Sequence, residues 1–361
     1  MAGITQPPQG IGEAVGIARE ATYGVAVAPD IWWRPISNTV RRKDPWVPLT
    51  GPTGSAVDMT TTRAVRYTPD ISGQLMVEAE YDDIGHLIMY ALGNYTTESV
   101  DTGYYTHAVN LSATIPATTP QSFTLARVTE LEQFQFAGCV IDAIEFSGRR
   151  DSLVTVTCDI VGQTGGAADV ADAIGTLSAA PFIEFHDSVF RADFGSTDQT
   201  LVAGDDQNAG AEALDWTVRF ENNFRFQPAA GVRDASGDPL RAIRQPTWGQ
   251  YRAATMRVSR DYFDDNFFDV YHHSTLASAY SSFAIVCTSN EIAANSNPYE
   301  LTFPFSAGIV IDGMNEYPGG PDVLGESITI KAGFDGTAAP AGVVLKNATG
   351  VSYNDGSTAI T

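Results

Sequence analysis

The pattern of apolar and polar residues predicts β-strands through most of the chain. Leu75, Val77 and Ala79 alternate with Gln74, Met76, Glu78 and Glu80, and a period of two is typical of a strand with one solvent-exposed face. Comparable runs predict further strands at 31–36, 123–127, 134–139, 141–146 and 153–161 in the first half. In the second half they predict strands at 183–190, 214–226, 251–258, 282–288, 299–305, 309–314 and 327–332.

Residues 81–92 change to helical spacing. Ile84, Leu87 and Ile88 can share one broad apolar face, and Gly93 follows as a stop signal. A second helix is predicted near residues 264–272. Each half is therefore expected to be a mainly antiparallel sheet with one helix laid on it.

An internal repeat divides the chain. The segment Ala137-Gly138-Cys139-Val140-Ile141-Asp142 returns as Ala307-Gly308-Ile309-Val310-Ile311-Asp312. Three further markers precede both copies in the same order, namely Gly73-Gln74 and Gly249-Gln250, Tyr81-Asp82-Asp83 and Phe263-Asp264-Asp265, and Ser122-Phe123 and Ser282-Phe283. Loop insertions shift spacing but leave order intact, so we interpret the chain as one β-rich unit, duplicated and fused.

This interpretation predicts an N-terminal arm at 1–15, a first unit at 16–163, a linker at 164–178, a second unit at 179–336 and a C-terminal segment at 337–361. The segment from Arg41 to Thr62 is rich in Pro, Gly and Thr. We expect it to be a long structureless loop, and loops of that length tend to be functional.

Composition narrows the partners. The chain has 361 residues, with 21 Lys and Arg against 43 Asp and Glu and a formal net charge of -22. Such a surface repels nucleic-acid phosphates and anionic lipid, although it suits a surface that DNA must pass without sticking. The N-terminus lacks the features of a signal peptide and no apolar stretch reaches bilayer length, so we expect a soluble, cytoplasmically made protein without membrane contact. The three cysteines, Cys139, Cys158 and Cys287, are expected to be buried free thiols.

Catalytic signatures are largely absent from the sequence, and neither an enzymatic activity nor a cofactor is expected. A weak metal-site candidate is Asp265, Asp269 and His272, because their helical spacing could place two carboxylates and an imidazole on one face. The ordinary explanation is that aspartates favour helix N-termini and histidines C-termini.

The segment from Gly16 to Pro29 carries a family resemblance. Its Glu20-Ala21-Thr22-Tyr23-Gly24-Val25 run resembles the Glu-x-Thr-Tyr-Gly-Thr element that opens tail tube proteins of long, non-contractile-tailed bacteriophages, with Val25 in place of Thr. The likeness extends through Leu92-Gly93, His107, the 120–124 strand and Gly138-Cys139, and so spans most of residues 16–162. For the second half it depends on the duplication alone.

The resemblance implies a mainly β fold of two tandem tail-tube-type β-barrels or sandwiches, each with one flanking α-helix. Members of this family have no enzymatic activity; they assemble into stacked rings whose inner strands join across subunits to line a channel. Single-barrel relatives form six-subunit rings, so a two-barrel chain should need three copies. The implied partners are the chain itself, together with tail terminator, tape measure and distal tail proteins. Viral DNA would pass through the lumen without specific binding, and the location would be the virion tail.

Two sets of residues become candidates under this resemblance. The channel-lining candidates are Gln74, Glu78, Glu80, Arg252 and Arg257. The ring-to-ring contact candidates are Arg41, Arg42, Lys43, Asp44, Trp46 and Asp58, together with the turn-rich stretch 228–239 and the N-terminal arm. The alternatives are another virion component, such as a tail terminator or capsid decoration protein, and a secreted β-sandwich carbohydrate-binding module.

Overall fold

The structure, a computed structural model, describes residues 13–43, 46–48, 64–66, 70–93, 95–111, 120–129, 133–167, 180–193, 198–202, 213–224, 252–261, 281–315, 325–333, 341–349 and 353. In the first half its elements are β1 (Ala14–Arg19), β2 (Ile31–Trp33), β3 (Ser37–Asn38), β4 (Arg41–Lys43), β5 (Trp46–Pro48), β6 (Ala64–Arg66), β7 (Asp70–Glu78), α1 (Ile84–Leu92), β8 (Thr96–Asp101), β9 (Tyr104–Asn110), β10 (Phe123–Val128), β11 (Gln133–Arg149), β12 (Thr155–Gly162) and β13 (Thr164–Ala167). The second half holds the 3-10 helix η3 (Phe185–Asp187), β14 (Ser188–Asp193), β15 (Asp198–Val202), β16 (Ala213–Glu221), β17 (Ala253–Asp261), β18 (Ser281–Ala294), β19 (Asn297–Asn315), β20 (Gly325–Ala332) and β21 (Gly342–Asn347).

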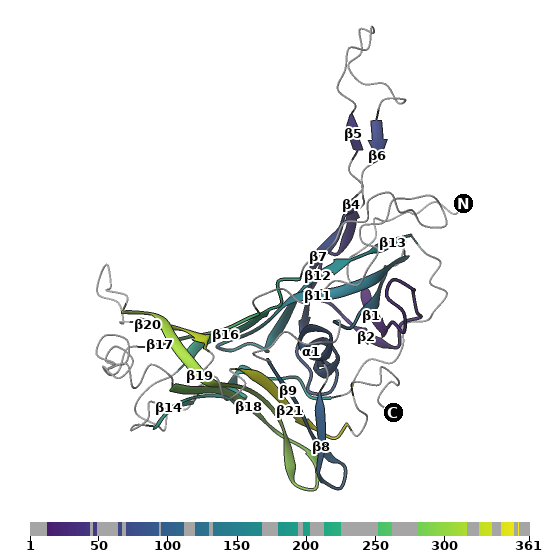
Figure 1. Cartoon of the computed structure of the whole chain (residues 1–361). Helices are drawn as coiled ribbons and strands as arrows, with labels where there is room; N and C mark the ends of the chain where they lie inside the picture. The colour runs from purple at the N-terminus through teal and green to yellow at the C-terminus, as the bar shows by residue number, and fades with distance from the viewer. Residues whose placement is uncertain are drawn as a thin grey trace, which may run out of the picture.

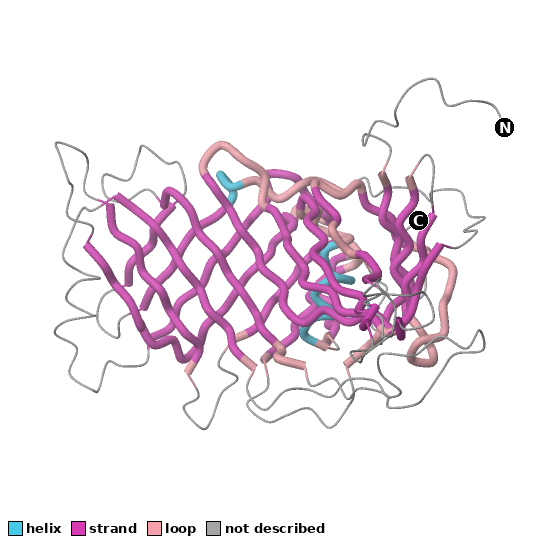
Figure 2. The backbone as a smooth tube through the Cα atoms, turned by 90° about the horizontal axis from the view of Figure 1, so that it is seen from above, coloured by secondary structure: helices cyan, strands magenta, loops and turns pink. Residues whose placement is uncertain are grey.

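The fold is mainly β, as the sequence predicts, with a 19-stranded antiparallel sheet and a separate two-stranded pair, β5 and β6. A continuous run of the large sheet goes from β3 and β4 through β7, β12, β11, β16, β17 and β20 to β19. Figure 1 shows this run as a curved layer, with α1, β9, β21 and β18 along one side of it. Seen from above, the strands of the layers cross one another (Figure 2).

The order of strand pairing occurs twice. In the first half β10 pairs with β1 and β11, β11 with β12 and β13, and β12 with β7. In the second half β18 pairs with β14 and β19, β19 with β20 and β21, and β20 with β17. The duplicated connectivity agrees with the sequence repeat. We call the strands from β1 to β13, with α1, the first unit and the strands from β14 to β21 the second unit.

The two units share one sheet and one core. β11 pairs with β16 across the junction, and β9 pairs with β21. Most buried apolar side chains of α1 and of both units belong to a single continuous cluster, beside which lie two small clusters. The units therefore do not have the separate cores that ordinary domain sizes suggest, because strands of one unit extend the sheet of the other.

The helix lies between layers of strands. The sequence predicts it at 81–92, and it is found at Ile84–Leu92. Tyr81 lies in the turn before the helix, where its N–H donates to the backbone oxygen of Pro181. All nine helical residues are buried. Gly93 closes the helix with a positive φ of 114° and donates to the backbone oxygen of Met89.

Several boundaries differ from the sequence prediction. The segment from Arg41 to Thr62 is not structureless throughout, because β4 pairs with β7 and β5 pairs with β6. The linker predicted at 164–178 begins with β13, whose glycines are held by pairing with β11. The strands predicted at 134–139 and 141–146 are one long strand, β11, interrupted by bulges. The helix predicted at 264–272 lies outside the described residues.

The motif that carries the family resemblance has a structural role. The buried Glu20 carboxylate accepts hydrogen bonds from the N–H of Gly24 at 2.9 Å, the N–H of Gly138 at 2.8 Å and the hydroxyl of Thr124 at 2.9 Å. Both glycines have positive φ, a conformation that side chains disfavour. Glu20 thus ties the loop after β1 to the bulge of β11.

The three cysteines are buried free thiols, as predicted. Burial raises the pKa of each thiol well above its ordinary value, so none is poised to react in the folded chain.

Candidate assembly surface

The outward face of the continuous sheet is polar, because buried and half-exposed residues alternate along its strands. In β16, Trp216, Val218 and Phe220 are buried, whereas Arg219 and Glu221 point to the other side. β12 and β17 alternate in the same way. We call the outward surface of β7, β12, β11, β16, β17 and β20 the polar face.

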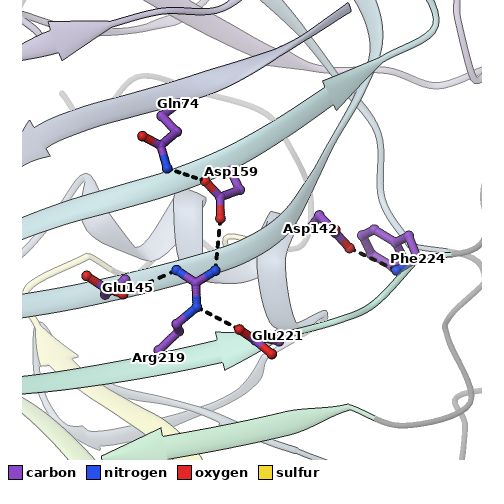
Figure 3. Close-up of polar contacts among 7 residues, drawn as sticks. All are labelled: Gln74, Asp142, Glu145, Asp159, Arg219, Glu221 and Phe224. Atoms are coloured by element: carbon purple, nitrogen blue, oxygen red, sulfur yellow. Dashed lines mark hydrogen bonds and ion pairs between the residues drawn. The ribbon is translucent and has the colours of Figure 1, made fainter. Parts of the chain in front are cut away.

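An arginine network crosses the polar face at the junction of the two units (Figure 3). The guanidinium of Arg219 contacts Glu221 at 2.8 Å, Asp159 at 3.0 Å and Glu145 at 3.2 Å. Asp159 also accepts a hydrogen bond from Gln74 at 2.8 Å. The network therefore links four adjacent strands, β16, β11, β12 and β7.

The charge of Arg219 is secured by these contacts. Burial alone would lower the pKa of the guanidinium, but its hydrogen bonds to Glu221, Glu145 and Asp159 outweigh burial and raise the pKa above the ordinary value. The side chains are about one-third exposed, at 35% for Arg219 and 33% for Glu145, so water screens the ion pairs. The three carboxylates thus engage the donors of the Arg219 guanidinium, while the ion pairs add little to the stability of the fold.

Behind the polar face, buried hydrogen bonds join the units. Asn222, at the end of β16, donates through Nδ2 to the backbone oxygens of Ala91 at 2.6 Å and Ile141 at 3.0 Å. Arg252 donates to Asn222 Oδ1 at 3.0 Å and to the backbone oxygen of Leu92 at 3.1 Å. Carbonyls at the C-terminus of α1 thereby find donors in the second unit.

Asp142 adds a second tie at this junction. Its backbone oxygen accepts from the N–H of Asn222, and its carboxylate accepts from the N–H of Phe224 at 2.8 Å (Figure 3). Burial raises the pKa of Asp142, and the hydrogen bond from Phe224 partly opposes the rise. The final residue of the first repeated segment therefore holds the chain that leaves β16.

The C-terminal part of the chain is bound against the start of α1. The Tyr353 side chain is 1% exposed; its hydroxyl donates to the backbone oxygen of Asp82 at 2.7 Å and accepts from Asn347 Nδ2 at 2.6 Å. The ring stands edge-on to His86 at 4.8 Å between centroids. A methyl group at Gly85 would overlap the Tyr353 ring, so the helix residue at this point has to be small.

Two more residues near the C-terminus complete this contact. Thr349 donates through its hydroxyl to the Asp82 carboxylate at 3.0 Å, and the amide of Asn347 lies 3.2 Å from His107 Nε2. We call Asn347, Thr349 and Tyr353 the C-terminal latch. The latch closes the first unit with Asn347, the last residue of β21, and with two residues that follow this strand.

The ionisable groups under the latch are buried. Burial, with the nearby charges of Glu80 and Asp82, raises the pKa of Asp83 to about 7. Burial lowers the pKa of His86 to about 4. Both groups are therefore neutral in weakly acidic solution, where each would otherwise carry a charge.

The continuous sheet ends in two edges. At one end β3 and β4 pair with β7, and at the other the Asp312–Asn315 part of β19 pairs with β20. Among the strands that the structure describes, no other strand pairs with these outer edges. Within the described strands, each edge therefore presents backbone groups to which another strand could pair.

The predicted channel-lining residues lie at different places. Gln74 and Glu78 are exposed on the polar face, and Arg257 is exposed there too, where it donates to Ser327 Oγ at 3.0 Å. Glu80 lies beyond β7, and its backbone forms an isolated antiparallel β-bridge with Phe182. Arg252 is held in the buried junction, where burial lowers its pKa to about 10.

Arg219 is not among the candidate residues, although the sequence predicts a strand over 214–226. The alternation through Trp216, Val218 and Phe220 places Arg219 on the polar side. Its carboxylate partners on β11 and β12 could not be identified, because they depend on pairing between the units.

The predicted ring-to-ring residues are partly described. Arg41, Arg42 and Lys43 form β4, with Arg41 and Lys43 exposed and Arg42 donating to the backbone oxygen of Gly165. Trp46 begins β5 opposite Arg66. Asp44 and Asp58 lie outside the described residues, as do the N-terminal arm and 228–239.

The weak metal-site candidate, Asp265, Asp269 and His272, also lies outside the described residues. Within the described ranges, no cluster of three or more His, Cys, Asp or Glu side chains could hold a metal ion. None of the helices described is long and apolar enough to span a membrane.

Comparison with known proteins identifies the family. Residues 10–251, more than half of the chain, match the phage tail tube protein family, and this match covers the first unit and continues through β16. A comparison with curated proteins found no match. The chain belongs to the phage tail tube protein family.

Proposed function

We propose that this protein is the structural subunit of a phage tail tube, in which copies close into rings and rings stack around a channel for DNA ejection. The observation that carries the proposal is the pairing of β11 with β16. This pairing joins the edge of the first unit to the edge of the second. The outer edges of the sheet, β4 and β19, are the counterparts of β16 and β11, so one copy could pair with the next copy in the same way.

This arrangement supports ring closure. The first unit contributes β3 and β4, β7, β12 and β11 to the continuous sheet, and the second contributes β16, β17, β20 and β19. A β19 edge meeting a β4 edge is a head-to-tail contact, which closes into a ring when the rotation permits. Three copies would supply six units, the number expected from single-barrel relatives.

The polar face would line the channel, with Gln74, Glu78 and Arg257 as exposed contributors. Acidic and basic side chains are mixed on this face, and Arg219 is engaged by three carboxylates. An arginine bound in this way offers little to DNA phosphates. Such a lining lets DNA pass without specific binding, and the protein needs no enzymatic activity or cofactor.

Contacts between rings would come from the segment that starts at β4. Arg41, Arg42, Lys43, Asp44, Trp46 and Asp58 belong to it, and the arm at 1–15 would add a second contact. Deleting residues 45–58 should leave rings but prevent normal tubes, as judged by negative-stain electron microscopy. Tubes of normal length from this variant would contradict the assignment.

The decisive experiment is electron microscopy of the purified chain and of phage lysates. We expect hollow tubes built from threefold rings, located in the virion tail beside the tail terminator, tape measure and distal tail proteins. Isolated rings confined to a tail end, or particles bound to capsids, would instead favour another virion component. Dispersed monomers with glycan affinity would refute the proposal.

A further inference from the structure

The junction between β11 and β16 is a template for contact between copies. In it Ala143 lies opposite Glu221 and Glu145 lies opposite Arg219. We propose that β4 of one copy pairs with β19 of the next in the same register, so that Lys43 lies directly opposite the neighbouring copy's Asp312. This inference rests on the proposed function and specifies its ring contact.

The two units can be aligned strand by strand from their pairing. One row of directly opposed residues in each unit crosses four strands, Val140, Val161, Ser72 and Arg41 in the first and Ile309, Lys331, Thr255 and Arg219 in the second. In both units a bulge follows one residue later, between Ile141 and Ala143 and between Val310 and Asp312. The bulges coincide in this alignment, which is shifted by one residue along β11 and β19 from the sequence repeat that matches Asp142 with Asp312.

The alignment assigns an equivalent to each residue of the template. Beyond the bulges, Ala143 lies opposite Asp159 and Asp312 lies opposite Thr329, so Asp312 takes the place of Ala143. Two residues past Arg219 and Arg41 stand Glu221 and Lys43. Asp312 and Lys43 are therefore the equivalents of Ala143 and Glu221, the pair that lies directly opposite across the β11–β16 junction.

Both backbone positions, on the edge strands β4 and β19, lie on the side of the sheet that carries the polar face. Thr329 lies between the buried residues Ile328 and Ile330, so Thr329 and the backbone position opposite it, that of Asp312, share the outward side. Lys43 is exposed and is equivalent to the outward Glu221. A slip of one residue would move one partner to the opposite face.

The charges suit this register. β4 carries three consecutive basic residues in a chain of net charge -22. Within the chain, Arg219 faces Glu145, whereas the equivalent Arg41 would face Met314. In the proposed contact the acidic residue is Asp312, which would lie directly opposite Lys43 and diagonal to Arg41. Opposite charges paired across strands favour a register, while backbone hydrogen bonds supply the pairing itself.

Disulfide trapping tests the register. Lys43→Cys with Asp312→Cys should form disulfides between copies on mild oxidation of assembled protein, giving a ladder on non-reducing gels that ends at the covalent trimer. The matched positive control is Ala143→Cys with Glu221→Cys, which should form an intramolecular disulfide. The shifted control, Lys43→Cys with Gly313→Cys, places the thiols on opposite faces. The native cysteines are buried and should not contribute.

A charge exchange provides a second test that needs no disulfide. Lys43→Asp and Asp312→Lys should each reduce the fraction of chains in rings several-fold, and the double variant should restore it. Restoration would support the register even if the cysteine variants assemble poorly. If single and double variants assemble alike, the register is wrong.

The outcomes separate this inference from the proposed function. Tubes that form normally but give no disulfide at 43 and 312, or equal trapping at 43 and 313, would overturn the register and leave the tube intact. The basic stretch of β4 would then act as edge protection against pairing. Wild-type protein that forms neither rings nor tubes would overturn both.

Discussion

The C-terminal latch should determine whether Gly85→Ala in α1 raises or lowers the stability of the chain. Gly85 lies inside α1, where Gly→Ala ordinarily stabilises a helix by about 1 kcal/mol. Here a methyl group would overlap the Tyr353 ring. We therefore expect Gly85→Ala to destabilise the wild-type chain, and to stabilise a chain in which Tyr353→Ala has made room for the methyl group.

The magnitudes follow from the contacts of Tyr353. Tyr353→Phe leaves the Asp82 backbone oxygen without its hydroxyl donor, whereas Asn347 Nδ2 keeps the backbone oxygen of Tyr81 at 3.2 Å. One unsatisfied buried carbonyl corresponds to a loss of roughly 2 kcal/mol. Tyr353→Ala also removes a fully buried ring and should lower the free energy of unfolding by about 3–5 kcal/mol.

Urea unfolding of the unassembled chain, followed by tryptophan fluorescence, would measure these changes. Tyr105→Phe is a matched control, because Tyr105 is only half-buried and should change the midpoint little. Two results would refute the reasoning. One is Gly85→Ala raising the midpoint in the wild-type background, and the other is Tyr353→Phe unfolding at the wild-type urea concentration.

Three further predictions concern buried charge, the polar face and the thiols. Burial raises the pKa of Asp83 from its ordinary value of 3.8 to about 7, so this carboxyl increasingly destabilises the fold as pH rises through that range. Asp83→Asn should therefore raise the free energy of unfolding by up to about 4 kcal/mol at pH 8 and by almost nothing at pH 4. Paired urea melts at the two pH values measure that difference, and an equal gain at both would contradict it. Arg219→Met should leave three carboxylates facing one another and lower the unfolding free energy by about 1–2 kcal/mol in dilute buffer, with most of the loss recovered at high salt; Arg257→Met is the control, and a salt-independent loss would argue against repulsion. Cys139, Cys158 and Cys287 should react with a thiol reagent only after unfolding, and rapid labelling of the native chain would show that they are not buried as described.

Local pattern was sufficient to predict most elements and insufficient for their partners. The alternation from Gln74 to Glu80 predicted β7, and the helical spacing after Tyr81 predicted α1. The strand β13 was missed because Thr164, Gly165 and Gly166 have little strand preference of their own; pairing with β11 holds them extended. The guanidinium of Arg252, a channel-lining candidate, is bound at the end of α1. Nothing in its neighbouring sequence indicates that contact.

By itself, the sequence determined that the chain is mainly β, that its plan is duplicated, and that its opening resembles tail tube proteins. These properties are written in periods of two residues and in short repeated segments, which act over neighbouring positions. Only the tertiary structure decided that β11 joins β16, that one core serves both units, and that Tyr353 binds Asp82 across 271 positions. Backbone hydrogen bonds between distant strands are the same for every residue type, so the packed shape of the whole chain selects which edges meet.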